Sequence, residues 1–209
     1  MRNHLHRLLT AGVIVIALNS SAAMGQSTFT QSIKVPTTPP ELQVPAGQVA
    51  YLKGHAVGTQ NYICLASASG FSWSFLGPQA TLFYTFEWFN NQISQQITTH
   101  FLSPNPVEGG TLRATWQSSL DTSAVWAFAI ASSTDPQFVE PNAIPWLLLQ
   151  VSGARQGPSG GSMLSQTTFI QRLNTSGGIA PSTGCSTSSN VGARAYIPYI
   201  TDYFFYKSK

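Results

Sequence analysis

The stretch SAVWAFAIA (residues 123–131) shows the pattern that decides the fold. Trp126, Phe128 and Ile130 alternate with mostly alanine, so the large side chains share one face and the small ones the other. Successive side chains of a β-strand point to opposite faces, and a period of two over a short segment is therefore typical of a strand. The stretch FSWSFLG (71–77) alternates in the same way. Both stretches predict β-structure.

Further apolar runs have the length of strands and are bounded by turn-forming residues. They are VAYL (49–52), TQNYICLA (59–66), ATLFYTFEWF (80–89), IPWLLLQVS (144–152), QTTFIQRL (166–173) and AYIPYITDYFFY (195–206). Few windows show helical spacing, and none of these is both long and capped. The sequence therefore predicts an all-β fold, a mostly antiparallel β-sandwich or partly open β-barrel of about seven to nine strands.

The N-terminus has the layout of a secretory signal peptide. Arginines precede the apolar run LLTAGVIVIAL (8–18), and small residues follow it, with cleavage expected near Ala23 or Gly25. This run is shorter than the roughly 20 residues that a membrane-spanning helix requires. Residues 1–25 are therefore predicted to direct export to the extracellular space or the periplasm and then to be removed, which leaves no transmembrane segment.

The rest of the chain is predicted to consist of a Pro/Thr-rich N-terminal arm (26–45) and a single β domain (46–209). Loss of Arg2 and Arg7 with the signal peptide reduces ten basic residues to eight, against seven acidic ones. No cluster of Lys or Arg remains that could follow a phosphate backbone. The composition thus predicts no binding of nucleic acid.

The stretch IQRLNTSGGIAPSTGC (170–185) ends on one of the two cysteines in the chain. Its glycine turn opens no long helix and has no nearby lysine, which argues against a phosphate-binding loop. Cys64 and Cys185 form no CxxC motif, so a redox site is not indicated either. In an exported protein such an isolated pair is best explained as one structural disulfide. Asn174, in the same stretch, lies in a glycosylation sequon.

Several motifs, in this order along the chain, carry a resemblance to a known family. They are GTQNYICLAS (58–67), SWSFLGPQATLF (72–83), PWLLLQVSG (145–153), SQTTFIQRLNTSGGIAPSTGC (165–185) and YIPYITDYFFY (196–206). With these motifs the chain resembles the family of secreted bacterial and fungal proteins called domain of unknown function 3455. The resemblance extends from about Pro45 to Tyr206. It implies no activity, because none is established for that family.

The segment HFLSPNPVEGGTLRATWQSSLDTS (100–123) resembles the family pattern at His100, Trp116 and Asp121. It departs from the pattern where Ser-Pro and a longer insertion stand in place of Gly-Pro, and where Thr122 stands in place of a glycine. If this segment is a site in the family, the resemblance implies that its geometry is altered here.

Arg172 and Thr175 complete the candidate site. An uncompensated charge within a sheet is costly, so Arg172 is expected to face solvent or to pair with a carboxylate, with Asp121 or Asp202 as its partner. Such a pair either belongs to a functional site or simply locks two strands together, and the second interpretation is favoured.

The residues give little support for catalysis. Beyond the signal peptide, His55 and His100 are the only histidines, and no HxH or HxxxH spacing gathers metal ligands. No G-x-S-x-G motif marks a nucleophile, and no two carboxylates can be assigned to facing strands, as glycoside cleavage would require. We therefore predict no metal and no cofactor.

Tryptophans next to amide and hydroxyl side chains indicate binding instead. Trp73 and Trp126 alternate with small residues and are predicted to lie in the core. Trp88 and Trp116 precede polar stretches, so they are placed at a rim, where such rings stack on sugars. The alternative is that both rim residues only cap the core.

Two hypotheses of function follow. The first is a non-catalytic binding module, secreted or associated with the cell envelope, whose partner is a glycan or another envelope component. The second is an extracellular hydrolytic or metal-assisted enzyme that uses His100 and Asp121. A concave pocket that holds both residues would favour the enzyme, whereas a face lined by Trp88 and Trp116 would favour the binding module. The sequence does not determine the oligomeric state.

Overall fold

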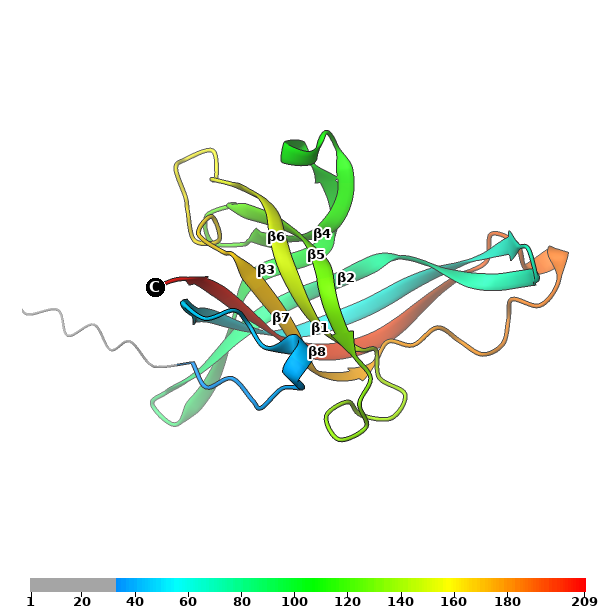
Figure 1. Ribbon diagram of the computed structural model, residues 1–209, viewed down its shortest axis with the longest axis horizontal. Helices are drawn as coiled ribbons and strands as arrows, with labels where there is room; N and C mark the ends of the chain where they lie inside the picture. The colour runs from blue at the N-terminus through cyan, green and yellow to red at the C-terminus, as the bar shows by residue number, and fades with distance from the viewer. Residues whose placement is uncertain (1–32) are drawn as a thin grey trace, which may run out of the picture. The chain divides into compact units, whose positions relative to one another are not determined.

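A computed structural model describes residues 33–209 (Figure 1). Within this range eight strands form one closed antiparallel barrel, in which each strand pairs with the next along the chain and β8 pairs with β1. The strands are β1 (Gln48–Ser67), β2 (Gly70–Trp88), β3 (Asn91–Asn105), β4 (Thr111–Ser118), β5 (Ala124–Ser133), β6 (Trp146–Arg155), β7 (Phe169–Gly177) and β8 (Arg194–Ser208). The predicted all-β antiparallel fold is confirmed, and of the two predicted architectures the chain adopts the barrel.

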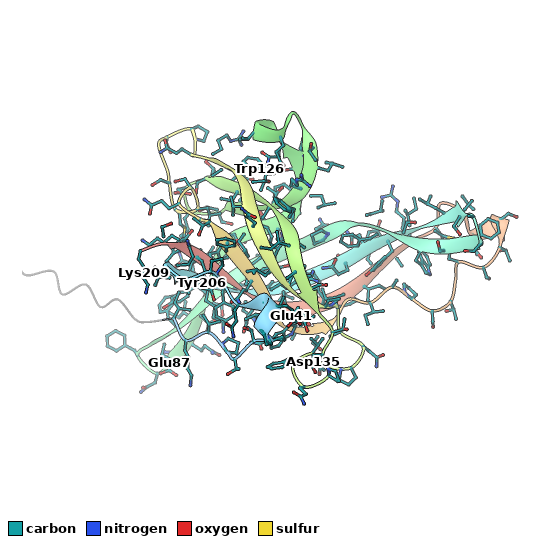
Figure 2. All side chains as sticks on the ribbon, viewed as in Figure 1. Glu41, Glu87, Trp126, Asp135, Tyr206 and Lys209 are labelled. Atoms are coloured by element: carbon teal, nitrogen blue, oxygen red, sulfur yellow. A yellow bond between two sulfur atoms is a disulfide. The ribbon has the colours of Figure 1, made fainter. Side chains whose placement is uncertain are left out.

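Residues 33–47 cover the outer face of the barrel over β6, β7 and β8. Their short 3-10 helix η1 (Pro40–Leu42) inserts Leu42, which is fully buried, among side chains that point outward from the strands, including Trp146, Phe204 and Tyr206. Figure 2 labels Glu41 of η1 and Tyr206 of β8. The predicted signal peptide lies outside the described residues. No helix within the described range is long and apolar enough to cross a bilayer.

The barrel interior contains a second cluster of buried side chains. Trp116, Tyr203 and Phe205 fill it together with aliphatic residues from the other strands. Position 58 of β1 requires glycine, because a Cβ atom there would lie 2.2 Å from the carbonyl oxygen of Gln79 on β2. The close approach of β1 and β2 therefore depends on glycine.

A loop of residues 156–168 lies over the end of the barrel where β6 ends and β7 begins. Leu164 of this loop is fully buried within the interior cluster. The Met163 amide donates to the Asp121 carboxylate at 2.8 Å, and the Tyr51 hydroxyl donates to the Met163 carbonyl at 3.2 Å. These contacts close this end of the barrel.

Beyond the barrel, β1, β2 and β8 continue as a three-stranded extension (Figure 1). The segment before β8, which contains the 3-10 helix η3 (Ser188–Asn190), is linked to it by the disulfide between Cys64 and Cys185, so the predicted pairing is confirmed. Trp73 donates to the Thr183 carbonyl at 2.9 Å. Trp73 is therefore a partly exposed residue of the extension, and its predicted place in the core is wrong.

Candidate functional site

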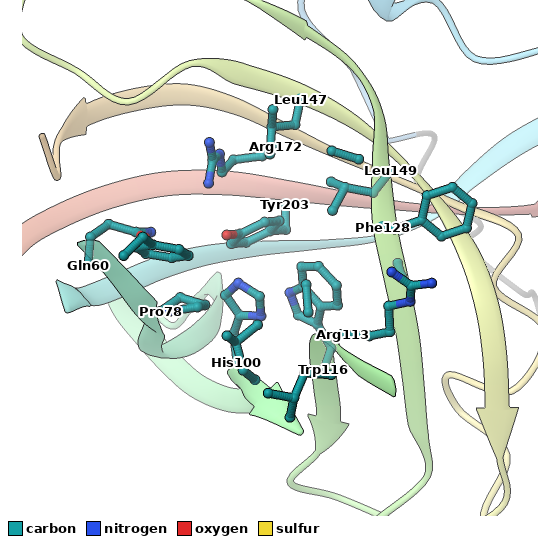
Figure 3. A pocket seen from close by; sticks show the side chains of 16 residues that line it. Gln60, Pro78, His100, Arg113, Trp116, Phe128, Leu147, Leu149, Arg172 and Tyr203 are labelled. Atoms are coloured by element: carbon teal, nitrogen blue, oxygen red, sulfur yellow. The ribbon is translucent and has the colours of Figure 1, made fainter. Parts of the chain in front are cut away.

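A cavity of about 240 Å³ lies within the barrel and opens to solvent beside the exposed side chains of Phe75 and Leu112; all eight strands contribute to its lining (Figure 3). Most of the lining is aliphatic or aromatic. The lining residues are Gln60, Phe75, Pro78, His100, Leu102, Leu112, Arg113, Ala114, Trp116, Ala127, Phe128, Ala129, Leu147, Leu149, Arg172 and Tyr203.

Small side chains on neighbouring strands leave room for the cavity. Ala114 on β4 pairs with Ala127 on β5, and both line the cavity. The alternation in residues 123–131 therefore turns alanines inward. Trp126 is buried on the outer side of the sheet, where its indole N–H donates to the Ser103 hydroxyl at 2.9 Å.

His100, Trp116 and Tyr203 form an aromatic cluster in the cavity wall. The rings of His100 and Trp116 are stacked with their centroids 4.1 Å apart, and Tyr203 meets both edge-on. The His100 Nδ1–H donates to the carbonyl oxygen of Thr115 at 2.9 Å. This bond fixes the tautomer, because a carbonyl can only accept, and leaves Nε2 as an acceptor.

Burial lowers the pKa of His100 to about 3, although the bond to the Thr115 carbonyl opposes the shift and the charge of Arg172 adds to it. An imidazolium ion would have to give up its hydration in this wall. His100 is therefore uncharged at neutral pH.

Arg172 lies on the inner face of β7, between Leu147 of β6 and Tyr203 of β8. Its Nε and Nη2 atoms donate to the Pro145 carbonyl at 3.1 and 2.8 Å. No carboxylate forms an ion pair with it among residues 33–209. The charge of Arg172 acts on the cavity wall, since burial raises the pKa of Tyr203 and this charge opposes the shift.

The predicted ion pair of Arg172 with Asp121 or Asp202 is therefore wrong. Asp202 accepts from Lys53 at 3.0 Å and from His55 at 2.9 Å, and Asp121 bonds to Ser123 and Met163. Asp202 also accepts from the Asn174 amide of β7 at 3.0 Å, so the groups bonded to either carboxylate do not include Arg172.

Two polar atoms in the cavity wall have no hydrogen-bond partner among the described residues. These are Nε2 of Gln60, a residue only 2% exposed, and the indole nitrogen of Trp116, which is fully buried. Figure 3 shows Gln60, the Arg172 guanidinium, the Tyr203 hydroxyl and the His100 ring facing a common space. The hydrogen-bonding groups of the cavity thus gather on one side of it.

The structure brings His100, Trp116 and Arg172 of the candidate site together in the cavity and places the other two elsewhere. Thr175 is buried and donates to the Ile144 carbonyl at 2.6 Å. Asp121 is in the turn between β4 and β5, does not line the cavity, and anchors the loop of residues 156–168.

The environment of Asp121 is that of a structural anchor. Burial alone would raise the pKa of Asp121, but hydrogen bonds from Met163, Ser123 and Ser118 lower it to about 2. The carboxylate is thus stabilised as an anion by the backbone it holds in place.

Of the two tryptophans that were expected at a rim, Trp116 differs from that expectation. Trp116 is fully buried inside the barrel, and nothing of its ring faces solvent. The side chain of Trp88 lies outside what the structure describes. Within the described range, no group of three or more His, Cys, Asp or Glu residues could hold a metal ion.

Sequence reasoning missed Gln60 and Tyr203. Tyr203 shares one face of β8 with Tyr199 and Phe205, and this alternation could have identified it. The opposite face of β8 is equally apolar, however, because residues 33–47 cover it. Gln60 has no signal in the sequence that separates it from the other amides.

The fold and the site define an antiparallel up-and-down barrel with an internal cavity. The chain belongs to the family described as "Protein of unknown function (DUF3455)", whose model matches residues 45–207. This match confirms the family resemblance. Neither a search of curated proteins nor a search of solved structures finds a match.

Proposed function

We propose that this chain is an exported, non-catalytic binding protein that encloses one small, mostly apolar molecule in its barrel. The observation that carries the proposal is the interior cavity of about 240 Å³, whose lining comes from all eight strands. Eight-stranded barrels are wide enough to hold one small ligand. Apolar walls with a few convergent polar groups are the usual features of a ligand site.

The size of the cavity limits the ligand. A volume of 240 Å³ corresponds to about eight water molecules at roughly 30 Å³ each. A ligand of on the order of ten non-hydrogen atoms therefore suits it, which is at the small end of ligand pockets.

A glycan is the less favoured partner. Sugar rings need many hydrogen bonds to their hydroxyl groups, whereas this lining is mostly hydrocarbon. The enzyme that would use His100 and Asp121 is also less favoured, because Asp121 is not part of the cavity wall. Export is supported by the disulfide between Cys64 and Cys185, since such bonds persist in oxidising compartments.

A ligand titration followed by two-dimensional NMR tests the proposed function. Toluene and octanamide serve as neutral apolar probes, and soluble oligosaccharides as the competing class. We expect the apolar probes to shift the amide signals of Ala127, Leu149 and Tyr203, which line the cavity.

Substitutions at two positions make this titration specific. Ala127→Phe fills the cavity and should abolish the shifts, with Ala127→Leu as a milder variant should the larger ring prevent folding. Ala66→Phe places the same ring on the exposed end of the extension and should leave binding unchanged. Shifts confined to the outer surface, or binding that survives a filled cavity, would contradict the proposal.

A further inference from the structure

Two arginines line the interior cavity, and they differ in their partners. Arg113 donates to the Glu108 carboxylate through Nε at 2.8 Å and through Nη2 at 2.9 Å, so its charge is compensated. The partners of Arg172 are neutral groups, the Pro145 carbonyl and the Tyr203 side chain, and within residues 33–209 it pairs with no carboxylate. A cation in an apolar wall is costly unless an anion compensates it. The cavity wall therefore favours a negatively charged group beside Arg172.

The uncompensated hydrogen-bonding atoms of the wall are donors. Nε2 of Gln60 and Nε1 of Trp116 are buried and have no acceptor among the described residues. A buried donor without an acceptor loses its hydration without compensation. With the guanidinium of Arg172, these donors suit a group that only accepts, as an ionised carboxylate does.

The charge of the wall limits the ligand to a single negative charge. His100 is buried and neutral, so it adds no second cation and contributes an acceptor at Nε2. Arg113 is already compensated by Glu108. A phosphate monoester carries about −1.5 to −2 near neutral pH, which one free arginine does not balance. A ligand with a single negative charge balances the charge of Arg172.

The rest of the wall suits hydrocarbon. Leu102, Leu147, Leu149 and Ala127 also line the cavity. We propose that the ligand is a small monocarboxylate with a hydrocarbon body, whose carboxylate is bound by Arg172 and Gln60. This inference rests on the proposed function and specifies its ligand.

Isothermal titration calorimetry with octanoate, octanamide and octyl phosphate tests the inference. Octanamide has the shape of octanoate without its charge. We expect the wild-type protein to bind octanoate at least about tenfold more tightly than octanamide, because hydrogen bonds that involve a charge are the stronger ones. Octyl phosphate should bind more weakly than octanoate.

Two variants locate the effect. Arg172→Gln should remove the preference for octanoate over octanamide. Arg155→Gln is the matched control, because Arg155 is exposed, lies over the outward-facing ring of Trp126 and does not line the cavity. The Arg172 Nε–H resonance of the wild-type protein provides a measurement that needs no variant. It should shift with octanoate and not with octanamide.

The outcomes separate the inference from the proposed function. If octanamide or octyl phosphate binds the wild-type protein as tightly as octanoate does, the inference is overturned while the proposed function stands. The same holds if Arg172→Gln keeps the preference. If neither octanoate nor the neutral probes bind inside the barrel, both fail.

Discussion

Acid should destabilise the fold through His100. The native state holds this ring neutral with a pKa of about 3, whereas an unfolded chain has the ordinary value of 6.5. Below pH 6.5 the unfolded state therefore binds a proton that the native state does not, and the free energy of unfolding falls as the pH is lowered. The contribution of His100 is present in full above its unfolded pKa and is lost toward its native pKa.

The size of this loss follows from the two pKa values. Between about pH 7 and about pH 4.5, the difference in proton binding amounts to about 2.5 kcal/mol. Within this window the native pKa hardly matters, because a native value of about 4 in place of about 3 changes the result by only about 0.2 kcal/mol. The predicted loss of unfolding free energy therefore depends mainly on whether burial keeps the His100 ring neutral.

Urea denaturation at the two pH values measures the effect, with His100→Asn as the comparison. Asparagine offers an N–H close to the position of Nδ1, which donates to the Thr115 carbonyl in the wild-type protein, and it does not titrate. The variant loses the stacking on Trp116 and should be less stable at both pH values. Between the two pH values, the free energy of unfolding of the variant should fall by about 2.5 kcal/mol less than that of the wild-type protein.

The difference between the two proteins is the decisive quantity. Carboxylates such as Asp121 titrate in both, so their contributions cancel. If the wild-type protein and His100→Asn lose the same stability between the two pH values, His100 is not held neutral and the reasoning is refuted. An NMR titration that shows His100 protonated near pH 6 would refute it too.

Three further changes have effects that can be estimated. Replacing Cys64 and Cys185 by serine should lower the free energy of unfolding in urea by about 4–5 kcal/mol, since the bond spans 121 residues, and a loss below about 1 kcal/mol would contradict this. Asp121→Ala should cost about 2–3 kcal/mol at neutral pH by the same assay, and this contribution should disappear in the wild-type protein as the pH falls from about 4 to 2. Gly58→Ala should cost about 3 kcal/mol in thermal unfolding, because the new Cβ would lie 2.2 Å from the Gln79 carbonyl oxygen, and an unchanged melting temperature would show that β1 and β2 can move apart.

The strands and the disulfide could be predicted because their signals are local. Period-two alternation in residues 71–77 and 123–131 indicates strands wherever they pack, and two cysteines leave only one possible pairing. The choice between barrel and sandwich depends on whether β1 pairs with β8, which are separated by most of the chain. No local pattern encodes that contact.

Trp126 is buried, as predicted, but the sequence does not tell which face of its strand lines the barrel interior. A strand normally turns its larger apolar face to the core, which would place Trp126 inside. Here alanines line the cavity and Trp126 packs outside against Ser103. Arg172 was expected to face solvent or to pair with a carboxylate, because an uncompensated charge within a sheet is costly. A charged residue facing a ligand cavity has no signature in the sequence that separates it from one in an ion pair.

The outer layer explains how a barrel of this size keeps a cavity. Space inside a protein costs stability, because the atoms that line it lose packing contacts. Residues 33–47 compensate for this cost by burying the outer apolar cluster, which includes Leu42, against the outer faces of β6, β7 and β8. These strands are therefore stabilised from outside. The inner faces of β7 and β8, which carry Arg172 and Tyr203, can present polar groups to a ligand without the core having to close over them.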